Sequence, residues 1–509
     1  MQKALLLEEN EKLQAQVHEL ALEIKGQELK IRDLEGQLAA ALRRLYGPRS
    51  EKISPGQLEF EFMKEAEENA VEIPPHADEA PDDEDTRPQG GRKRGHGRKP
   101  LPRDLPRRRI EHHPEDLHCH GCGAVMDPIG EEITEELEYV PASLFIQEHA
   151  RIKYACRKCQ EGVRIAPLPS RPIEKGRPGP GLLAHVVVSK YGDHLPLNRQ
   201  AVIFRREGLD LSRSTLCDWI AGAAELALPV YRELKRQVLA SEVIQTDDTP
   251  VTMQLNGQKG GRKRCFLWVY RGISGPVLLD FTTSRSRAGP REFLGDYRGY
   301  LQADAYAGYN DLFKTGRVVE VGCWAHARRY FHEALVPSPE LASLFLGNIR
   351  RLYKLERNAK DQGLTEKEIL DLRQSKAVPI LDDLHEALQA TKDMALPKSP
   401  LGKAVHYALS NWIALNRYTE DGRLPIDNNA AERCLRKVAV GRRNWLFTGS
   451  KEGGHRAAIL YSLILSCQET GVEPFAYLRD LFDRLPAQPV NRIAELTPAG
   501  WKAARQAGD

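Results

Sequence analysis

The stretch Ser241–Met253, "SEVIQTDDTPVTM", decides the fold of the central part of the chain. It is typical of a strand that carries Asp247 and Asp248 at its end. "CFLWVYRG" and "PVLLDFTT" follow as apolar strands, and "GYLQADAYAGYN" presents Asp304 after another strand-like run. Because a helical region and then Glu432 on a helix come later, the pattern predicts an α/β core whose carboxylates converge at the edge of the sheet.

Two aspartates and a glutamate form a ligand set with a known use. Phosphodiester cleavage by two metals needs hard oxygen ligands that hold a pair of Mg²⁺ (or Mn²⁺) ions about 3.5–4 Å apart. Each acid also has an ordinary explanation, since Asp248 before Thr249-Pro250 could form a turn and Asp304 could cap the segment after it. The three together favour a two-metal site.

The glutamate lies in "PIDNNAAERCLRKVAVGRRNW", Pro425–Trp445, among many cations. One explanation is a surface helix in which Glu432 pairs with Arg436, a contact worth a few tenths of a kcal/mol. The other is a metal-binding carboxylate beside a surface that holds an anionic polymer. The cations that would form this surface are Arg433, Arg436, Lys437, Arg442 and Arg443.

The region between Asp304 and Glu432 is longer than one strand and one helix require. Residues 337–423 are rich in leucine, charge and helix formers, which predicts a helical insertion between core segments 241–336 and 424–485. The remaining residues, 486–509, are expected to form a C-terminal tail.

"GCWAHARRYFHEA" precedes the insertion. Its Cys323 and His326 could be metal ligands, but a lone C-x-x-H is weak evidence, and packing or hydrogen-bonding roles near the acids stay open. Arg328 and Arg329 are candidate phosphate contacts.

Helical spacing begins after Pro178 and predicts three helices at about 181–191, 197–207 and 212–226, with a turn at Gly208. This arrangement favours a helix-turn-helix domain over 176–240, although three-helix packings that bind no DNA are common. Ser212 can cap the third helix. The first turn of that helix, where a recognition helix meets base edges or phosphates, then contains Arg213, Ser214 and Thr215.

Two C-x-x-C pairs stand in residues 111–175, and together they supply the four thiolates of a structural zinc site. The connector between the pairs contains β-prone residues, so a hairpin could bring them together in a zinc-ribbon-like module. It is longer than the usual spacing, and one pair could instead be redox-active. The four expected ligands are Cys119, Cys122, Cys156 and Cys159.

The N-terminal residues 1–47 follow a heptad pattern, with leucine mostly at d and β-branched residues frequent at a. This pattern predicts a parallel coiled coil that forms a homodimer or higher oligomer, the alternative being an amphipathic helix docked on its own chain. Residues 48–110 have the opposed charge blocks and few apolar residues of a disordered linker. Its basic block, Arg92–Arg109, could contact DNA or its acidic neighbour.

The composition sets outer limits on the class of protein. The chain has 509 residues and 41% hydrophobic content, enough for a multidomain α+β protein with at least one large core. Its apolar runs fall short of the roughly 20 residues that span a bilayer, and the acids among its first residues lead us to expect no secretory signal. The nine cysteines make a poor disulfide framework, so a cytoplasmic protein is expected.

The motifs together resemble the IS66 family of DDE transposases, encoded by bacterial insertion sequences. The resemblance spans nearly the whole chain, in order. It rests on "RRLYGPRSEKI", the two cysteine pairs, "LLAHVVVSKYGDHLPLNRQ", "EGLDLSRSTLCDWI", "TDDTPV", "LQADAYAGYN", "CWAHARRYFHEA" and "IDNNAAERCLRKVAVGRRNWLFTGSKEGGHRAAILYSLI".

The resemblance implies an RNase H-like core with an acidic triad at Asp247, Asp304 and Glu432. The family usually has Ala-Asp-Glu-Thr-Pro where this chain has Thr-Asp-Asp-Thr-Pro, so Asp248 stays a second candidate for the first ligand.

The implied activity is cleavage of the element's ends to give 3′-OH groups and their joining to target DNA. The partners would be double-stranded DNA and accessory proteins of the same element, and the protein would associate with the nucleoid. Trp445 could stack on an unpaired base. Two rival classes are a sequence-specific DNA-binding regulator, which has no use for the acids, and a simple nuclease, which has none for the coil.

Overall fold

The computed structural model describes residues 178–255, 261–273 and 275–506, with short stretches between 144 and 176. The predicted coiled coil, the charged linker and the four cysteines of the expected zinc site lie outside the described residues. Two short strands, β1 (Lys153–Ala155) and β2 (Val163–Ile165), pair antiparallel within a compact unit of their own. Cys156 and Cys159 fall between these strands in the sequence.

The central sheet has five strands in the order β5-β4-β3-β6-β7. β3 pairs antiparallel with β4 and β4 with β5, whereas β3 pairs parallel with β6 and β6 with β7, so the sheet is mixed. The four strands predicted for the core are present, whereas the hairpin predicted between the cysteine pairs lies largely outside the described residues. The bounds are β3 Val243–Gln254, β4 Arg262–Gly272, β5 Val277–Thr282, β6 Gly299–Gln302 and β7 Val318–Val321.

The two aspartates lie in the middle of β3, and the prediction that they end the strand was wrong. β3 continues to Gln254 because its antiparallel partner β4 accompanies it that far. Its parallel pairing with β6 stops at Gln245, two residues before Asp247. Asp247 therefore lies where β3 and β6 are no longer paired.

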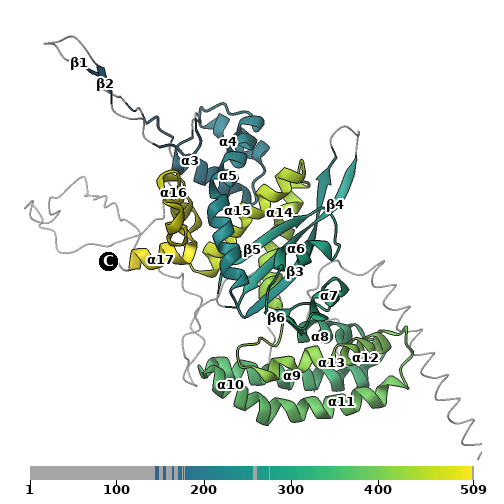
Figure 1. The fold of residues 1–509 in the computed structure, drawn as a ribbon. Helices are drawn as coiled ribbons and strands as arrows, with labels where there is room; N and C mark the ends of the chain where they lie inside the picture. The colour runs from purple at the N-terminus through teal and green to yellow at the C-terminus, as the bar shows by residue number, and fades with distance from the viewer. Residues whose placement is uncertain are drawn as a thin grey trace, which may run out of the picture. The chain divides into compact units, whose positions relative to one another are not determined.

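A first hydrophobic core joins the sheet to helices from both ends of the described chain, with α5, α14 and α15 packed against the strands (Figure 1). Ser462 and Ser466 on α15 accept hydrogen bonds from the backbone N–H groups of Leu279 and Val277 on the edge strand β5. The helices are α3 (Pro180–Tyr191), α4 (Leu197–Arg206), α5 (Arg213–Leu239), α14 (Asn429–Trp445), α15 (Lys451–Glu469), α16 (Pro474–Arg484) and α17 (Pro498–Gln506). Shorter helices are α6 (Ala288–Leu294), η1 (Ala307–Tyr309), α7 (Asn310–Phe313), η4 (Leu485–Ala487) and η5 (Val490–Leu496).

Two segments in this core differ from expectation. The third predicted helix, α5, continues past 226 to Leu239 because Val230, Leu234 and Val238 extend its buried stripe. The predicted tail, 486–509, contains η5 and α17, which hold buried side chains such as Trp501.

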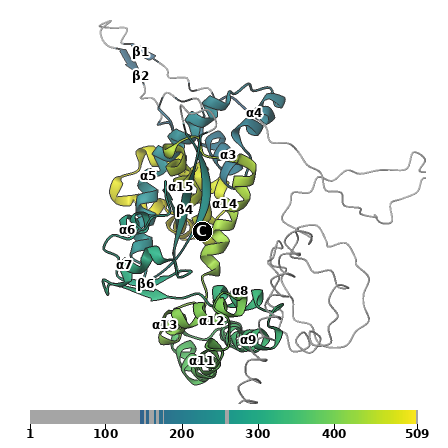
Figure 2. The ribbon, with the colours of Figure 1, turned by 90° about the vertical axis from the view of Figure 1, so that its right-hand side faces the viewer.

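A second hydrophobic core lies in the helical region predicted between the two sheet segments (Figure 2). It also includes α8, which follows β7. The elements are α8 (Trp324–Glu333), α9 (Pro339–Asp361), α10 (Glu366–Leu372), the π-helical turn η2 (Arg373–Ala377), α11 (Val378–Lys392), α12 (Pro400–Ser410), α13 (Trp412–Asn416) and η3 (Arg417–Glu420). No helix in the described part of the chain is long and apolar enough to cross a membrane.

Candidate active site

Asp247 and Asp304 occupy equivalent places on neighbouring parallel strands. The last pair between β3 and β6 joins Gln245 to Gln302. Asp247 comes two residues after Gln245, and Asp304 comes two residues after Gln302. The carboxyl ends of parallel strands meet at one edge of a sheet, where open α/β folds bind ligands. Ala305, next to Asp304, has a φ of 65°, a backbone conformation that is uncommon for a residue with a side chain.

A network of buried amides attaches the start of α14 to this edge. The Gln245 side chain donates to the Gln302 side chain at 2.8 Å and to the Asp427 carbonyl at 3.0 Å. The Gln302 amide donates to the Pro425 carbonyl at 2.7 Å. Asn428 donates from its side chain to the Thr246 carbonyl at 2.9 Å. These hydrogen bonds fix the helix that carries the glutamate against the strands that carry the aspartates.

The first turn of α14 places Glu432 over the acids. Asp427, which precedes the N-cap residue Asn428, accepts the backbone N–H of Asn429 at 3.0 Å. Its other oxygen accepts the hydroxyl of Tyr353 from α9 at 2.9 Å. Glu432 follows in the same turn.

The carboxyl of Asp247 is affected by the charges of the other two predicted acids. Burial, and then the negative charges of Asp304, Glu432 and Asp248, raise the pKa of its carboxyl to about 7. The backbone N–H of Asp248 donates to Asp247 at 2.8 Å and partly opposes this shift. Two ionised carboxylates in one site repel each other unless a cation neutralises them. The group therefore has the electrostatics of a cation site.

Asp248 differs from its neighbour because it already has a counter-charge. Arg285 forms an ion pair with it at 2.8 Å, and only 6% of the Asp248 side chain is exposed. Burial raises the pKa of the Asp248 carboxyl, and the hydrogen bond and charge of Arg285 lower it. Among the residues that the structure describes, none forms an ion pair with Asp247.

Glu432 has a half-satisfied carboxylate. His326 Nδ1 lies 3.6 Å from Oε1, and an Arg329 nitrogen lies 3.7 Å from Oε2. His326 Nδ1 and Glu432 Oε1 are both buried without a hydrogen-bond partner. Burial lowers the pKa of His326, although Glu432 and Asp304 oppose this, so the ring is held neutral. Buried polar atoms in native proteins are nearly always satisfied, so an orphaned carboxylate oxygen fits a metal ligand.

Cys323 lies beside these groups, and one donor atom each from Cys323, His326 and Glu432 falls within 4.8 Å of the others. Its sulfur accepts the backbone N–H of Asn428 at 3.2 Å, and burial raises the pKa of the thiol to about 12. A thiol that is protonated and already hydrogen-bonded serves the packing of α14.

The remaining predicted contacts are distributed over three helices. At the start of α5, Ser212 accepts the backbone N–H of Thr215 at 3.0 Å, which confirms the predicted cap, and Arg213 and Ser214 are exposed. On α8, Arg329 is exposed, whereas burial lowers the pKa of the Arg328 guanidinium.

The cations of α14 have two kinds of environment. Arg433 and Arg443 are exposed, while Arg436, Lys437 and Arg442 are partly buried. Trp445, predicted to stack on a base, is partly buried against the first core and donates to the Tyr461 hydroxyl at 3.3 Å. Stacking would require that it leave this contact.

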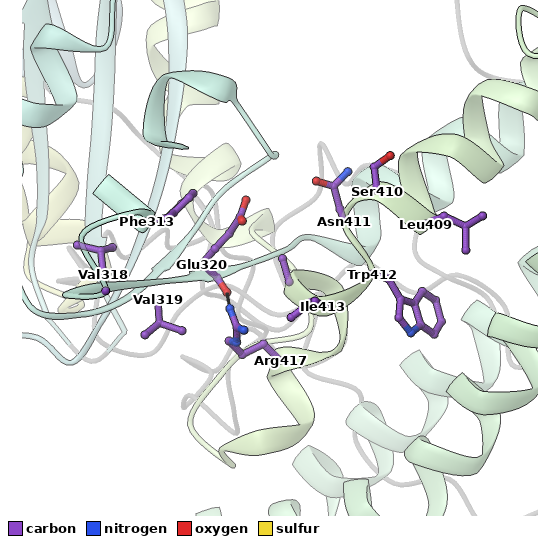
Figure 3. Close-up of a pocket in the computed structure, with 12 residues that line it drawn as sticks. Phe313, Val318, Val319, Glu320, Leu409, Ser410, Asn411, Trp412, Ile413 and Arg417 are labelled. Carbon is purple, nitrogen blue, oxygen red and sulfur yellow. Dashed lines mark hydrogen bonds between the residues drawn. The ribbon is translucent and has the colours of Figure 1, made fainter. Parts of the chain in front are cut away.

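A cavity of about 480 Å³ lies away from the acids, along the outer edge of β7 (Figure 3). Val318, Glu320, Trp412 and Arg417 are among its lining residues, and Arg417 donates to the Glu320 carbonyl at 2.7 Å. None of the predicted site residues lines this cavity.

The sheet is mixed, and its acids lie where the pairing of β3 with β6 stops, beside the helix that carries Glu432. The chain belongs to the IS66 family of transposases, because residues 175–456 match the model described as "Transposase IS66 family". Residues 116–160 match "zinc-finger binding domain of transposase IS66", residues 33–110 match "Transposase C of IS166 homeodomain", and residues 462–499 match "IS66 C-terminal element". The resemblance inferred from the motifs is confirmed.

The chain is also similar to curated proteins of Sinorhizobium fredii. It is 32% identical over 502 residues to "Uncharacterized protein y4jD", and the aligned region covers 92% of this chain and 95% of that protein. It is 35% identical over 439 residues to "Uncharacterized protein y4hP", covering 81% and 78%. A DDE transposase requires a divalent metal and DNA, and the zinc-finger match indicates zinc.

Sequence reasoning missed the amides that support the site. Gln245 and Gln302 each stand two residues before an aspartate, in "QTD" and "QAD". In a strand, residues two apart share a face. This repeated spacing could have indicated that the two glutamines lie on the same face as the aspartates and beside them. No such signal marks Asn428.

Proposed function

We propose that this transposase cleaves the ends of its insertion sequence to give 3′-OH groups and joins them to target DNA. Its core would be RNase H-like, with the helical insertion between the second aspartate and the glutamate. The observation that carries the proposal is the convergence of Asp247, Asp304 and Glu432 where β3, β6 and α14 meet. Burial first, and then the negative charges of the neighbouring acids, raise the pKa of Asp247, and a cation between the acids would relieve this cost.

Asp247, Asp304 and Glu432 would hold two Mg²⁺ (or Mn²⁺) ions. A divalent metal bound there supplies Lewis acidity toward the phosphodiester and its attacking oxygen. The amide network of Gln245, Gln302 and Asn428 keeps the carboxylates oriented. His326 and Arg329 hold Glu432 in place until the site fills, and the exposed guanidinium of Arg329 can then turn to a phosphate.

The rest of the chain would bind and pair the DNA ends. The first turn of α5, with Arg213, Ser214 and Thr215, would read the end sequence as a helix-turn-helix does. The cations of α14 and Arg328 would contact phosphates. The zinc module would be closed by Cys119, Cys122, Cys156 and Cys159, and the coil at 1–47 would make a homodimer or higher oligomer. Accessory proteins of the same element are further partners.

The test is an end-cleavage assay with purified protein, Mg²⁺ and DNA from the boundary of the element. Asp247→Asn, Asp304→Asn and Glu432→Gln should each reduce cleavage by about 10³-fold or more, since each removes charge that stabilises the transition state. All three should still bind the end DNA. Equal loss of binding and cleavage in all three variants would make the acids structural, and degradation without defined 3′ ends would indicate a simple nuclease.

The dimerisation proposal has its own measurement. Deleting residues 1–45 should leave a monomer in sedimentation that binds one end and does not pair two. A truncated protein that sediments as a dimer would place the dimer contact elsewhere.

A further inference from the structure

Beyond the aspartates, the strand paired with β3 is strongly basic. β3 and β4 extend together past the acids as a two-stranded ribbon, and Arg262, Lys263 and Arg264 at the start of β4 are all exposed. With Arg442 of α14 they line a cavity of about 430 Å³ together with Pro250, Val251, Thr252 and Leu446. None of these described lining residues is acidic, and the sequence has no acid from Thr249 to Cys265.

Arg442 anchors this basic pocket. Its guanidinium donates to the Thr249 hydroxyl at 2.8 Å and to the Pro250 carbonyl, so it is fixed beside β3. Burial lowers the pKa of Arg442, and the positive charges of Arg443 and Arg264 add to this. Cations gathered without a carboxylate repel one another, and an anionic ligand relieves that repulsion.

An apolar corner adjoins the pocket where α14 ends. Leu446 has a φ of 65°, which lies in the left-handed region that residues with side chains rarely adopt. Its side chain is 65% exposed, and that of Phe447 is 41% exposed. The corner is not loose, because the backbone N–H of Thr448 donates to Thr252 at 2.8 Å and that of Gln254 donates back to Thr448 at 2.9 Å. The backbone is thus held in a conformation that presents two apolar side chains to solvent.

Phosphates and exposed bases are the one ligand chemistry that matches both features. Four cations with no acid among the described lining residues suit a polyanion, and an apolar pair held rigidly beside them suits a base or a base step that can be unstacked. The pocket is also close to the acids. Four residues of strand separate Asp247 from Val251, which is about 13 Å, or roughly four nucleotides of a B-form strand.

We propose that the basic pocket and the Leu446–Phe447 corner form a DNA site, in which the pocket holds backbone phosphates a few nucleotides from the cleaved bond and the corner wedges against a base. The inference rests on DNA being the substrate in the proposed function. It assigns to Leu446 and Phe447 the base contact that Trp445, bound to Tyr461, does not offer. The phosphate contacts are independent of base sequence, so the site would secure the strand without selecting it.

The first experiment measures binding of the full chain to fluorescein-labelled duplexes by anisotropy, over a range of salt and without Mg²⁺. One duplex carries the end of the element, and the other is a scrambled sequence of equal length. In Arg262→Ala/Lys263→Ala/Arg264→Ala, both duplexes should bind roughly tenfold more weakly or worse. The slope of log K against log salt should fall in magnitude by about 2.7, since each of the three phosphate contacts contributes about 0.9. The matched control, Lys367→Ala/Lys392→Ala/Lys398→Ala, removes three exposed cations of the helical insertion and should leave the slope unchanged.

The second experiment tests the wedge with 2-aminopurine placed in turn at each of the terminal nucleotides. Wild-type protein should raise the fluorescence at one position, because an unstacked base is less quenched. Leu446→Ser/Phe447→Ser should lose that rise and keep the wild-type salt slope. Circular dichroism melts of each variant show whether the fold is kept, which is expected for exposed side chains.

Two results overturn the proposal: an unchanged salt slope in the three-cation variant, or a rise in 2-aminopurine fluorescence that survives the loss of both apolar side chains. These outcomes are separate from those of the cleavage assay. If the protein binds DNA but never cuts it, the proposed function fails. The salt slope of the three-cation variant still shows whether the basic pocket contacts phosphates. If the protein cuts DNA normally and the salt slope does not change in that variant, only the proposal for the basic pocket is rejected.

Discussion

Two buried polar clusters in this molecule have opposite hydrogen-bond states. In the second core, the guanidinium of Arg373 is 3% exposed and fully engaged: Glu356 accepts from it at 2.6 and 2.8 Å, and the carbonyls of Tyr418 and Asp421 accept at 2.7 and 2.8 Å. At the acidic edge of the sheet, His326 Nδ1 and Glu432 Oε1 are buried with no hydrogen-bond partner.

The difference separates a structural ion pair from a site that needs a ligand. Arg373 opens the π-helical turn η2 and ties it to α9 and to the end of η3, so its charge is used within the fold. A satisfied buried network adds rigidity, whereas an unsatisfied one costs free energy until a partner arrives. The negative charges of Asp304 and Glu432, which add to the effect of burial in raising the pKa of Asp247, are such a cost.

The largest expected contrast comes from removing one glutamate from each cluster. Glu356→Ala should lower the free energy of unfolding by about 3–5 kcal/mol, because Arg373 keeps a buried charge without its partner. Glu432→Ala removes a source of repulsion and should leave stability within about 1 kcal/mol of wild type, or raise it. Urea denaturation measures both, and hydrogen exchange of α9 and η2 locates the first effect. A Glu432→Ala variant as unstable as Glu356→Ala would make Glu432 a structural residue and remove the contrast.

The pH dependence of the metal-free protein should sharpen the comparison further. Asp247 has a folded pKa of about 7 against an ordinary value of 3.8, so the folded state binds an extra proton between these values. Stability from this group is fully present below about pH 4 and is lost as the pH rises through 7, with a ceiling of about 4 kcal/mol at 1.36 kcal/mol per pKa unit.

Asp247→Asn should therefore flatten the fall in melting temperature between about pH 4 and pH 7. Asp280, whose pKa burial raises to about 6, titrates in both proteins and cancels in the difference. Mg²⁺ should restore stability to the wild type at high pH and do little for Asp247→Asn, since it stabilises by binding only the folded site. Parallel pH curves for the two proteins without metal would contradict the raised pKa.

Local sequence pattern was enough to predict strands β3 to β6, the three helices before them and the helical insertion, because each has its own apolar spacing, but it did not predict β7. It could not predict where the pairing of β3 with β6 stops, since that depends on β6 being only four residues long. The length of α5 also follows from tertiary contact, because Tyr231 donates to the Leu279 carbonyl of β5 at 2.9 Å. The orphaned state of Glu432 and the inward contact of Trp445 depend in the same way on groups distant in sequence.

The smallest expected effect concerns Asp248, which the sequence left as a rival to Asp247. Arg285 is 43% exposed, and an ion pair with one exposed member contributes about 1 kcal/mol or less, so Asp248→Asn should lower stability only slightly. A double-mutant cycle with Arg285→Ala should return a coupling of that size.

The same variant separates the two aspartates by function. Because Arg285 already neutralises Asp248, the Asp248→Asn variant should keep a third or more of the end cleavage. The Asp247→Asn variant should keep almost none. Both changes swap a carboxylate for an amide of equal size on adjacent residues of β3, so each is the control for the other. If Asp248→Asn instead abolished cleavage as completely as Asp247→Asn does, the ion pair between Arg285 and Asp248 would have to open during the reaction. In that case, a counter-charge in the resting protein would no longer distinguish a structural acid from a metal ligand.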